Sequence, residues 1–422
     1  MDTLTIQKTG VSTNSKIFIP SSKSYIHRYL LSALLADGES VIENVSFSKD
    51  IEATLSCIRN LGAVVFADGS TIRIKGGIRR LKEVSLYCNE SASTLRFVIP
   101  IATLFADSIE YTGAKSLLER PLGVYFDIFR KNQMPFEFEK GKFLRLSGAF
   151  NSREYVIDGS VSSQFVTGLL FTLPAMDFDS VIVIDGKLES KPYVDITLEV
   201  LKNSGIEIVN NDYKSFEIKG SQKYKSGRFF AQGDYSQAAF FLAAGCFAGG
   251  IECVNMEPMS LQGDKAIVGI LKNMGAVICN TPNGFRIEKS ALKAIGEIDA
   301  TDFPDIVPIL SVVCSVAGGT TVIKGIERLR IKECDRVLAT VDILTKLGAD
   351  IKEEQNAIVI NGKPMLKGGT VSSYNDHRIA MSASVAALMC EEAVTIENPM
   401  SINKSYPKFY DDLHSTGTVK YV

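Results

Sequence analysis

Two kinds of helix-forming segment alternate along this chain. The first kind is apolar on nearly every side and begins with polar or charged residues, which is typical of a helix buried in the core of a domain. Six such segments begin near Lys23, Ser91, Ser162, Tyr235, Pro304 and Asp376. The second kind is amphipathic and leads into a turn, a strand, another turn and another strand. Its copies end near Gly62, Asn132, Gly205, Gly275, Gly348 and Gly417.

Both patterns recur about every 70 residues, which is the signature of an internal repeat. Repeats of this length fill the chain of 422 residues. Each repeat is predicted to contain one buried helix, one amphipathic helix and four strands in the order β-α-β-α-β-β. A break between residues 221 and 233 would divide the six repeats into two halves of three. The opening strand, LTIQKT, precedes the first repeat, and its pattern would allow pairing with either half.

The polar beginnings of the buried helices are the only parts of those helices that a ligand could reach. A helix N-terminus attracts anions through its unpaired N–H groups and its dipole. If the buried helices of both halves run in the same direction, their N-termini converge on the cleft between two domains. The sequence therefore predicts an anion-binding site in an interdomain cleft.

The densest group of charges is the segment RIKECDR, which places the cations Arg330, Lys332 and Arg336 beside the carboxylates Glu333 and Asp335. Apolar residues follow it at helical spacing, so the charges lie at the start of an amphipathic helix. Taken alone, such a cluster could be a solvated loop whose charges pair with one another. Polar residues recur at the other helix starts, and this recurrence favours a binding site.

The first helix start, PSSKSYIHR, places Lys23 and His27 one helical turn apart, and likewise Ser24 and Arg28. It resembles a truncated phosphate loop but lacks the spacing GxxxxGK(S/T), so no nucleotide site is predicted, and a plain helix cap is the alternative. Hydroxyl, amide and cationic side chains that could hold an anion stand at or after the other helix starts. They are Arg96, Arg120, Ser162, Ser163, Gln164, Ser190, Tyr193, His377, Arg378 and Lys404. Ser91 and Ser93 are small residues that let a ligand approach the backbone, and Asp305 and Asp376 stand where a helix begins, where an acid favours the helix dipole.

Composition narrows the class of partner. The formal net charge is -2, with 45% hydrophobic and 22% charged residues, which favours neither nucleic acid nor a membrane surface as a partner. The eight cysteines are scattered without a CxxC pair, as is typical of a reducing compartment. The N-terminal segment has no signal pattern, and the apolar runs are too short or too interrupted to span a bilayer. We therefore expect a cytoplasmic protein with small anionic partners.

Eight features carry a resemblance to one known family. In this order and spacing, PSSKSYIHR, ESASTLR, ERPLG, SSQF, SKPY, RIKECDR, YNDHR and the late Lys404 resemble 5-enolpyruvylshikimate-3-phosphate synthase along the whole chain. The resemblance implies a two-domain inside-out α/β barrel, the enolpyruvyl transferase fold. Residues 12–225 would form one domain, residues 1–11 with 226–422 the other, and the cleft between them would hold the active site.

The resemblance also implies an activity. The enolpyruvyl group of phosphoenolpyruvate would pass to the 5-hydroxyl of shikimate 3-phosphate through a tetrahedral ketal, with loss of phosphate. No metal or organic cofactor is implied, and a monomer is expected. Asp305 is the candidate base for the hydroxyl proton, and Glu333 or Lys23 is the candidate acid toward the methylene carbon. Which of these groups moves which proton stays open.

The same resemblance assigns residues to each substrate. Those for shikimate 3-phosphate are Lys23, Ser24, Arg28, Ser162, Ser163, Gln164, Ser190, Tyr193, Asp305 and Lys332. Those for phosphoenolpyruvate are Lys23, Ala92, Arg120, Gln164, Arg336, Arg378 and Lys404.

Four positions depart from the family pattern. Ser21 replaces a usual Gly, and Glu90 and Arg328 each replace a frequent Asn, which affects local contacts and not the implied activity. Ala92 stands where the family frequently has Gly. Its β-carbon is expected to narrow the pocket, so that glyphosate, which is longer than phosphoenolpyruvate, binds poorly.

Three alternatives were weighed against this interpretation. The enolpyruvyl transferase that acts on UDP-N-acetylglucosamine shares the six-repeat fold but typically has Cys where this chain has Lys115. RNA 3'-phosphate cyclases have related repeats but rely on a nucleotidylated His, whereas His27 and His377 lie within the matched transferase motifs. A non-catalytic anion-binding relative would have lost part of the site, yet every matched acid and base is present.

Overall fold

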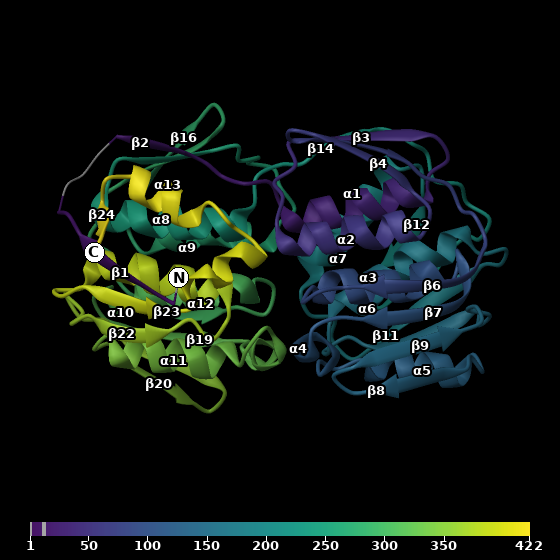
Figure 1. Cartoon of the computed structure of the whole chain (residues 1–422). Coiled ribbons are helices and arrows are strands. Elements are labelled where there is room, and N and C mark those ends of the chain that lie inside the picture. The colour runs from purple at the N-terminus through teal and green to yellow at the C-terminus, as the bar shows by residue number, and fades with distance from the viewer. Residues whose placement is uncertain (1, 11–13) are drawn as a thin grey trace. The chain divides into compact units, whose positions relative to one another are not determined.

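The structure is a computed structural model that describes residues 2–10 and 14–422. The chain folds into two compact units (Figure 1). We call Ser21–Ala231 the continuous unit, and Met1–Pro20 with Gln232–Val422 the split unit. Within the described residues, each unit contains three four-stranded sheets and a hydrophobic core of its own.

The strands of the continuous unit are β3 (Glu39–Glu43), β4 (Val64–Asp68), β5 (Thr71–Lys75), β6 (Leu81–Tyr87), β7 (Ala106–Thr112), β8 (Phe136–Glu139), β9 (Phe143–Ser147), β10 (Glu154–Asp158), β11 (Ser180–Asp185), β12 (Ile208–Asn211), β13 (Ser215–Ile218) and β14 (Arg228–Phe230). They form sheets in the orders β14-β3-β5-β4, β6-β7-β9-β8 and β10-β11-β13-β12. In each sheet the first two strands are parallel, and the remaining neighbours are antiparallel.

The strands of the split unit are β1 (Thr3–Lys8), β2 (Ser15–Phe18), β15 (Ile251–Val254), β16 (Val277–Thr281), β17 (Gly284–Glu288), β18 (Gly296–Asp299), β19 (Thr320–Lys324), β20 (Asp350–Glu354), β21 (Ala357–Asn361), β22 (Gly369–Ser372), β23 (Val394–Glu397) and β24 (Val419–Tyr421). Their sheets have the orders β2-β15-β17-β16, β18-β19-β21-β20 and β22-β23-β1-β24. The parallel pair again stands at one edge of each sheet.

Two kinds of helix connect these strands, as the hydrophobic pattern predicted. The helices of the continuous unit are α1 (Lys23–Leu35), α2 (Lys49–Asn60), α3 (Ala92–Ala102), α4 (Lys115–Leu118), α5 (Gly123–Lys131), α6 (Ser163–Thr172) and α7 (Lys191–Asn203). Those of the split unit are α8 (Tyr235–Ala248), α9 (Ala266–Asn273), α10 (Val307–Ser315), α11 (Arg336–Lys346), α12 (His377–Ala386) and α13 (Phe409–Ser415). Short 3-10 turns η3 (Pro304–Ile306), η4 (Glu327–Ile331) and η6 (Pro399–Lys404) flank the site described below.

The nearly all-apolar helices α1, α3, α6, α8, α10 and α12 lie inside their units. Every residue of α1 from Tyr25 to Leu35 is buried, and so is every residue of α8 from Tyr235 to Phe247. The buried helices α3, α6, α10 and α12 each link the two parallel strands of a sheet, as α3 links β6 to β7. The helices α1 and α8 instead precede β3 and β15, whose parallel partners β14 and β2 come from elsewhere in the chain. An amphipathic helix then leads to the antiparallel hairpin, as α7 leads to β12 and β13. The six-repeat β-α-β-α-β-β prediction and the α/β fold class are confirmed.

The chain crosses between the units later than the sequence suggested. The predicted boundary between residues 11 and 12 lies outside the described residues, but β2 pairs in parallel with β15 of the split unit. Likewise β14 pairs with β3 of the continuous unit, although the prediction placed residues after 225 in the other domain. Each sheet has a parallel pair of strands at one edge, and β2 and β14 each supply one strand of such a pair. Both strands are too short to show an alternating pattern in the sequence. The boundaries at 11/12 and 225/226 are therefore corrected to 20/21 and 231/232.

The opening strand β1 fills a gap in the last repeat. It lies antiparallel between β23 and β24, so the N-terminal strand completes a sheet that the C-terminal segment begins. This pairing assigns to the split unit the strand that the pattern alone could not assign.

Candidate active site

The predicted ligand residues of the continuous unit gather at the N-terminal ends of its buried helices. Lys23, the first residue of α1, donates a hydrogen bond from Nζ to Asp50 Oδ2 at 2.6 Å, and Asp50 lies in the first turn of α2. Ser22, which precedes Lys23, is buried as the N-cap of α1. The ion pair fixes the position of the Lys23 ammonium at the start of the helix.

Arg28 lies one turn further along α1 and is 2% exposed. Its Nε donates to Thr197 Oγ1 at 2.8 Å, and its two Nη groups donate to the carbonyls of Ser24 and Tyr193 at 2.7 and 2.8 Å. These bonds tie α1 to α7. Burial lowers the pKa of Arg28 to about 10, although the nearby Tyr193 and Tyr25 act to raise it, so the guanidinium is charged at pH 7.

Arg96 and Gln164 connect α3 to α6. Arg96 Nη1 donates to Gln164 Oε1 at 2.8 Å, and Gln164 Nε2 donates to Ser93 Oγ at 2.9 Å. The guanidinium of Arg96 also lies over the ring of Phe165, 5.0 Å from its centroid. The two hydrogen bonds determine which way the Gln164 amide faces, because its oxygen meets a cation and its nitrogen meets a hydroxyl.

The remaining predicted residues of this unit stand at or near other helix starts. Ser162 is the N-cap of α6, and its hydroxyl accepts a hydrogen bond from the backbone N–H of Gln164 at 3.3 Å. Ser163 is the first residue of that helix. Ser190 is the N-cap of α7 and has a left-handed φ of 55°, an uncommon conformation for a residue with a β-carbon. Tyr193 follows in the first turn of α7.

Ala92 and Arg120 occupy two further positions of this unit. Ala92 is the first residue of α3. Arg120 lies in the connection between α4 and α5, directly before Pro121, whose carbonyl accepts a hydrogen bond from Arg96 at 3.1 Å. Ser21, at a position where a glycine was expected, forms a reciprocal pair with Ser46: each amide donates to the other hydroxyl, at 2.9 and 2.8 Å.

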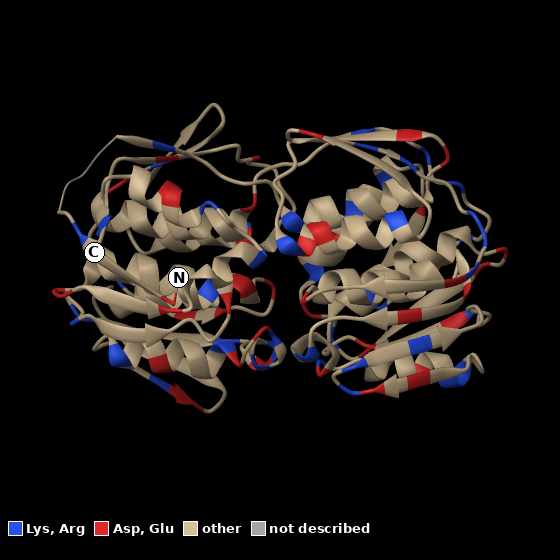
Figure 2. Ribbon diagram, in the orientation of Figure 1, with Lys and Arg blue, Asp and Glu red and all other residues tan. Residues whose placement is uncertain are grey.

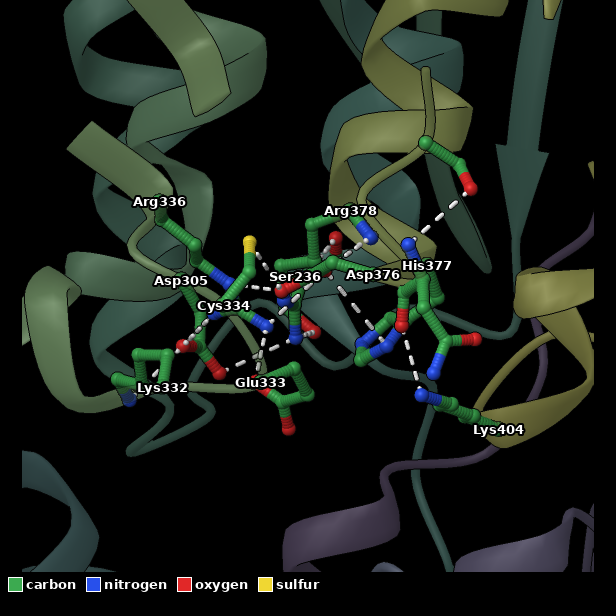
Figure 3. A network of polar contacts seen from close by, with 12 residues as sticks. Ser236, Asp305, Lys332, Glu333, Cys334, Arg336, Asp376, His377, Arg378 and Lys404 are labelled. Atoms are coloured by element: carbon green, nitrogen blue, oxygen red, sulfur yellow. Dashed lines mark hydrogen bonds and ion pairs between the residues drawn. The ribbon is translucent and has the colours of Figure 1, made fainter. Parts of the chain in front are cut away.

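The split unit holds a denser cluster around Arg336 (Figure 3). The Arg336 side chain is 2% exposed and donates to three carboxylates. Its Nη1 lies 2.9 Å from Asp305 Oδ1, its Nη2 lies 2.7 Å from Glu333 Oε2, and its Nε lies 2.7 Å from Asp376 Oδ2. Asp305 comes from η3, Glu333 precedes α11, and Asp376 is the N-cap of α12.

Two further cations converge on Asp305. Lys332 Nζ lies 3.1 Å from Asp305 Oδ1, and Arg378 Nη2 lies 3.1 Å from Asp305 Oδ2. Arg378 also donates to the hydroxyl and carbonyl oxygens of Ser236, at the start of α8. The starts of α8, α10, α11 and α12 therefore meet at one place within the split unit. Lys404, at the end of η6, donates to the carbonyl of Asn375 at 2.7 Å.

The charges of this cluster shift one another's pKa values. Burial alone would raise the pKa of Asp305, but Lys332, Arg378 and Arg336 together hold it well below its usual range. Burial would lower the pKa of Arg336, and Asp376, Glu333 and Asp305 instead raise it well above its usual value. The pKa of Lys332 is lowered, chiefly by burial, although Asp305 opposes the shift. Asp305 is therefore an ionised carboxylate, and Arg336 and Arg378 are cations.

The cluster is a network of ion pairs between three cations and three carboxylates. Lys332, Arg336 and Arg378 face Asp305, Glu333 and Asp376, so charges of opposite sign balance locally. An incoming phosphate or carboxylate would have to compete with Asp305 or Glu333 for the guanidinium of Arg336.

Sequence reasoning missed several residues that build these clusters. It gave no role to Asp50, Thr197 or Ser236, which receive hydrogen bonds from Lys23, Arg28 and Arg378. Asp50 follows a serine at the start of an amphipathic helix, so its position as a first-turn acid was visible. Its partner was not visible, because the two residues belong to different helices.

Other features of the molecule do not compete with these clusters. Within the described part of the chain, no group of three or more His, Cys, Asp or Glu side chains could hold a metal ion. No helix among the described residues is both long and apolar enough to cross a membrane. A cavity of about 500 Å³ lies beside the C-terminal end of α8, with mostly apolar lining that includes Phe247, Leu292 and Met389. None of the predicted site residues lines it. Figure 2 shows basic and acidic segments interspersed over both units.

Six β-α-β-α-β-β repeats, with cations and helix N-termini gathered in each half, define a protein of the enolpyruvyl transferase fold. A sequence profile of EPSP synthase (3-phosphoshikimate 1-carboxyvinyltransferase) matches residues 8–413. The chain belongs to this family.

Curated relatives and solved structures agree with this assignment. A 3-phosphoshikimate 1-carboxyvinyltransferase of Clostridium novyi is 45% identical over 417 residues, which cover 96% of each chain. One of Clostridium acetobutylicum is 46% identical over 407 residues, covering 95% of this chain and 94% of the relative. A structure of EPSP synthase from Acinetobacter baumannii aligns over 100% of both chains with a TM-score of 0.84 at 23% identity, which shows the shared fold.

Proposed function

We propose that this chain transfers the enolpyruvyl group of phosphoenolpyruvate to the 5-hydroxyl of shikimate 3-phosphate. The products are 5-enolpyruvylshikimate 3-phosphate and phosphate, and the reaction is a step of the shikimate pathway toward chorismate and the aromatic amino acids. The observation that carries the proposal is the buried Asp305 carboxylate among Lys332, Arg336 and Arg378, in a chain whose family match spans residues 8–413.

Both units supply binding groups in this proposal. The two substrates carry two phosphates and two carboxylates between them, and helix N-termini and cations bind such groups well. For shikimate 3-phosphate we propose Lys23, Ser24, Arg28, Ser162, Ser163, Gln164, Ser190, Tyr193, Asp305 and Lys332. For phosphoenolpyruvate we propose Lys23, Ala92, Arg120, Gln164, Arg336, Arg378 and Lys404. Holding both reactants in place can contribute several kcal/mol to the lowering of the barrier.

The reaction proceeds by addition and then elimination. The 5-hydroxyl oxygen bonds to C2 of phosphoenolpyruvate and loses its proton to a base, while the C3 methylene takes a proton from an acid and becomes a methyl group. The bond from C2 to the phosphate oxygen then breaks, phosphate leaves, and the methyl group returns a proton. We assign the base to Asp305 and the acid to Glu333 or Lys23.

The low pKa of Asp305 bears on this assignment. A carboxylate whose pKa lies far below neutrality is a weak base, and the adjacent cations keep Asp305 so. Substrate phosphate and carboxylate groups that bind Lys332, Arg336 and Arg378 would compensate those charges. The pKa of Asp305 would then rise toward a value useful for catalysis, so the base becomes effective when both substrates are bound.

We further propose that the chain acts as a monomer in the cytoplasm. All eight of its cysteines are free thiols, as is usual in a reducing compartment. Neither UDP-N-acetylglucosamine transfer nor a non-catalytic role is favoured by any relative described above.

The test is phosphate release by the purified protein supplied with both substrates. We expect release that requires shikimate 3-phosphate and that stays at background when UDP-N-acetylglucosamine replaces it. Release with UDP-N-acetylglucosamine alone would assign the chain to the other transferase. No release with either acceptor, from a protein that binds both substrates, would contradict the proposed activity.

A further inference from the structure

A line of buried hydrogen bonds joins three helices beside the proposed site of the continuous unit. His27 Nδ1 on α1 lies 2.7 Å from Thr54 Oγ1 on α2, and Thr54 Oγ1 lies 2.7 Å from Thr94 Oγ1 on α3. Thr94 Oγ1 in turn donates to Ser91 Oγ at 2.7 Å. All four side chains are at most 1% exposed. Water therefore does not supply alternative partners within this line.

The number of protons fixes the direction of the line. A threonine hydroxyl has one proton, and that of Thr94 is donated to Ser91. Its longer contact to the carbonyl of Asp50, at 3.4 Å, is a weaker alternative. Thr94 must therefore accept the proton of Thr54. Thr54 then has no proton left for His27, so His27 must donate from Nδ1.

The surroundings of His27 agree with a neutral ring protonated on Nδ1. Burial, and then the charges of Lys23 and Arg28, hold the pKa of His27 well below its usual value. Nε2 is buried and has no hydrogen-bond partner among the described residues. A bare ring nitrogen there leaves an acceptor unpaired, whereas a protonated one would bury a donor without an acceptor.

Ser91 stands at the end of this line with its own proton unassigned. Its Oγ accepts twice from Thr94, once from the hydroxyl and once from the backbone amide at 3.2 Å. Both bonds come from a residue within α3, so the remaining hydrogen-bonding capacity of the Ser91 hydroxyl is not used by that helix. No acceptor for that proton is found among the described residues. Helix N-termini are where anions bind, and the next residue is Ala92.

We propose that His27, Thr54 and Thr94 form a one-way hydrogen-bond relay that makes Ser91 a donor to an anionic oxygen of phosphoenolpyruvate. The inference deepens the proposed function and rests on it for the identity of the ligand. Ser91 is then a binding residue, and His27, Thr54 and Thr94 are positioning residues. The relay keeps Ser91 from donating inward, so its hydroxyl adds to the backbone amides at the start of α3.

The relay itself can be tested without any ligand. Nitrogen NMR of protein labelled with 15N-histidine, at pH 7, should show the His27 ring neutral with its proton on Nδ1. The His27→Gln variant identifies the signals, since the chain has 3 histidines. In Thr54→Val, which removes the acceptor for that proton, the Nδ1-protonated signature should be lost. A wild-type ring protonated on Nε2, or an unchanged ring in Thr54→Val, would overturn the relay.

The role of Ser91 is tested by kinetics. Ser91→Ala should raise KM for phosphoenolpyruvate about tenfold, equivalent to about 1.4 kcal/mol, with kcat and KM for shikimate 3-phosphate within about twofold of wild type. Ser91→Thr keeps a hydroxyl and a helix cap and should restore the lower KM. Thr54→Val should lie between these two, and the control Thr172→Val, which loses only a bond to its own helix, should match wild type.

A second outcome separates binding from helix capping. Ser91→Ala also removes the N-cap of α3, so the melting temperature of this variant should fall whether or not Ser91 binds phosphoenolpyruvate. A lower melting temperature with an unchanged KM for phosphoenolpyruvate would reduce Ser91 to a cap and overturn its proposed role. If the wild-type chain released no phosphate, the proposed function would fail, while the tautomer of His27 would still decide the relay.

Discussion

Arg28 and Arg96 of the continuous unit are held differently from Arg336 and Lys332 of the split unit. In the continuous unit, Arg28 and Arg96 donate to hydroxyl, amide and carbonyl oxygens, which are neutral. In the split unit, Arg336 and Lys332 donate to carboxylates. Neutral acceptors orient a guanidinium without cancelling its charge, whereas carboxylates do both.

This difference teaches how each unit would meet an anion. Arg28 is already oriented by neutral oxygens and keeps its charge, so an anion can bind near it without displacing a charged partner. Arg336 is saturated by Asp305, Glu333 and Asp376, so an anion can bind it only if one of these carboxylates moves or is itself compensated. We infer that Arg28 is prearranged for an anion, whereas Arg336, and likewise Lys23 with its partner Asp50, must exchange partners.

The largest expected effect comes from the carboxylate at the centre of the split unit. Asp305→Asn keeps the shape of the cluster but removes a base, so kcat should fall about a hundredfold or more. Shikimate 3-phosphate should still bind, as measured by equilibrium titration. Asp342→Asn, which alters a carboxylate paired with Lys346 outside the cluster, is the control and should keep normal turnover. Full turnover in Asp305→Asn would remove this residue from the mechanism.

A smaller effect is expected in the continuous unit at Ala92. Replacing it with glycine removes a β-carbon from the start of α3, where glyphosate needs more room than phosphoenolpyruvate. The inhibition constant for glyphosate in Ala92→Gly should fall about tenfold, while KM for phosphoenolpyruvate changes much less. Ala102→Gly, at the other end of α3, controls for the lower helix propensity of glycine. Equal inhibition constants in Ala92→Gly and wild type would contradict the steric explanation.

The smallest effect concerns stability in acid. The folded pKa of Asp305 lies below its unfolded value, so its contribution to stability is complete above about pH 4 and is lost as pH falls through the folded pKa. Between pH 5 and 3, the free energy of unfolding should therefore fall more steeply in wild type than in Asp305→Asn. Urea unfolding at a series of pH values measures this difference. Parallel curves would show that the cations do not depress the pKa of Asp305.

Much of the fold could be predicted because its signals are local. A helix without a polar face, such as α8, is expected to be buried. The polar residues at its start then mark the end of the helix that a ligand can reach. The recurrence of that pattern predicted six repeats. The strands β2 and β14 are short and carry no alternating pattern, so their partners and the unit boundaries could not be read from the sequence.

The candidate site was predictable in its residue types but not in its partners. The motif around Arg336 showed that cations and carboxylates stand together. The apolar spacing after it showed that these charges lie at the start of a helix. That Asp376 would bind Arg336 depends on two helices packing side by side, which no local pattern encodes. The same holds for Arg28 and Thr197, which meet only because α1 packs against α7.

A crystal structure of the protein with shikimate 3-phosphate and glyphosate tests the contrast between the units most directly. We predict that the bonds from Arg28 to Thr197 and from Arg96 to Gln164 remain at hydrogen-bond distance. The Arg336 guanidinium should exchange Asp305 or Glu333 for an oxygen of the inhibitor. A complex in which Arg336 keeps all three carboxylates, while Arg28 or Arg96 changes partners, would contradict the account.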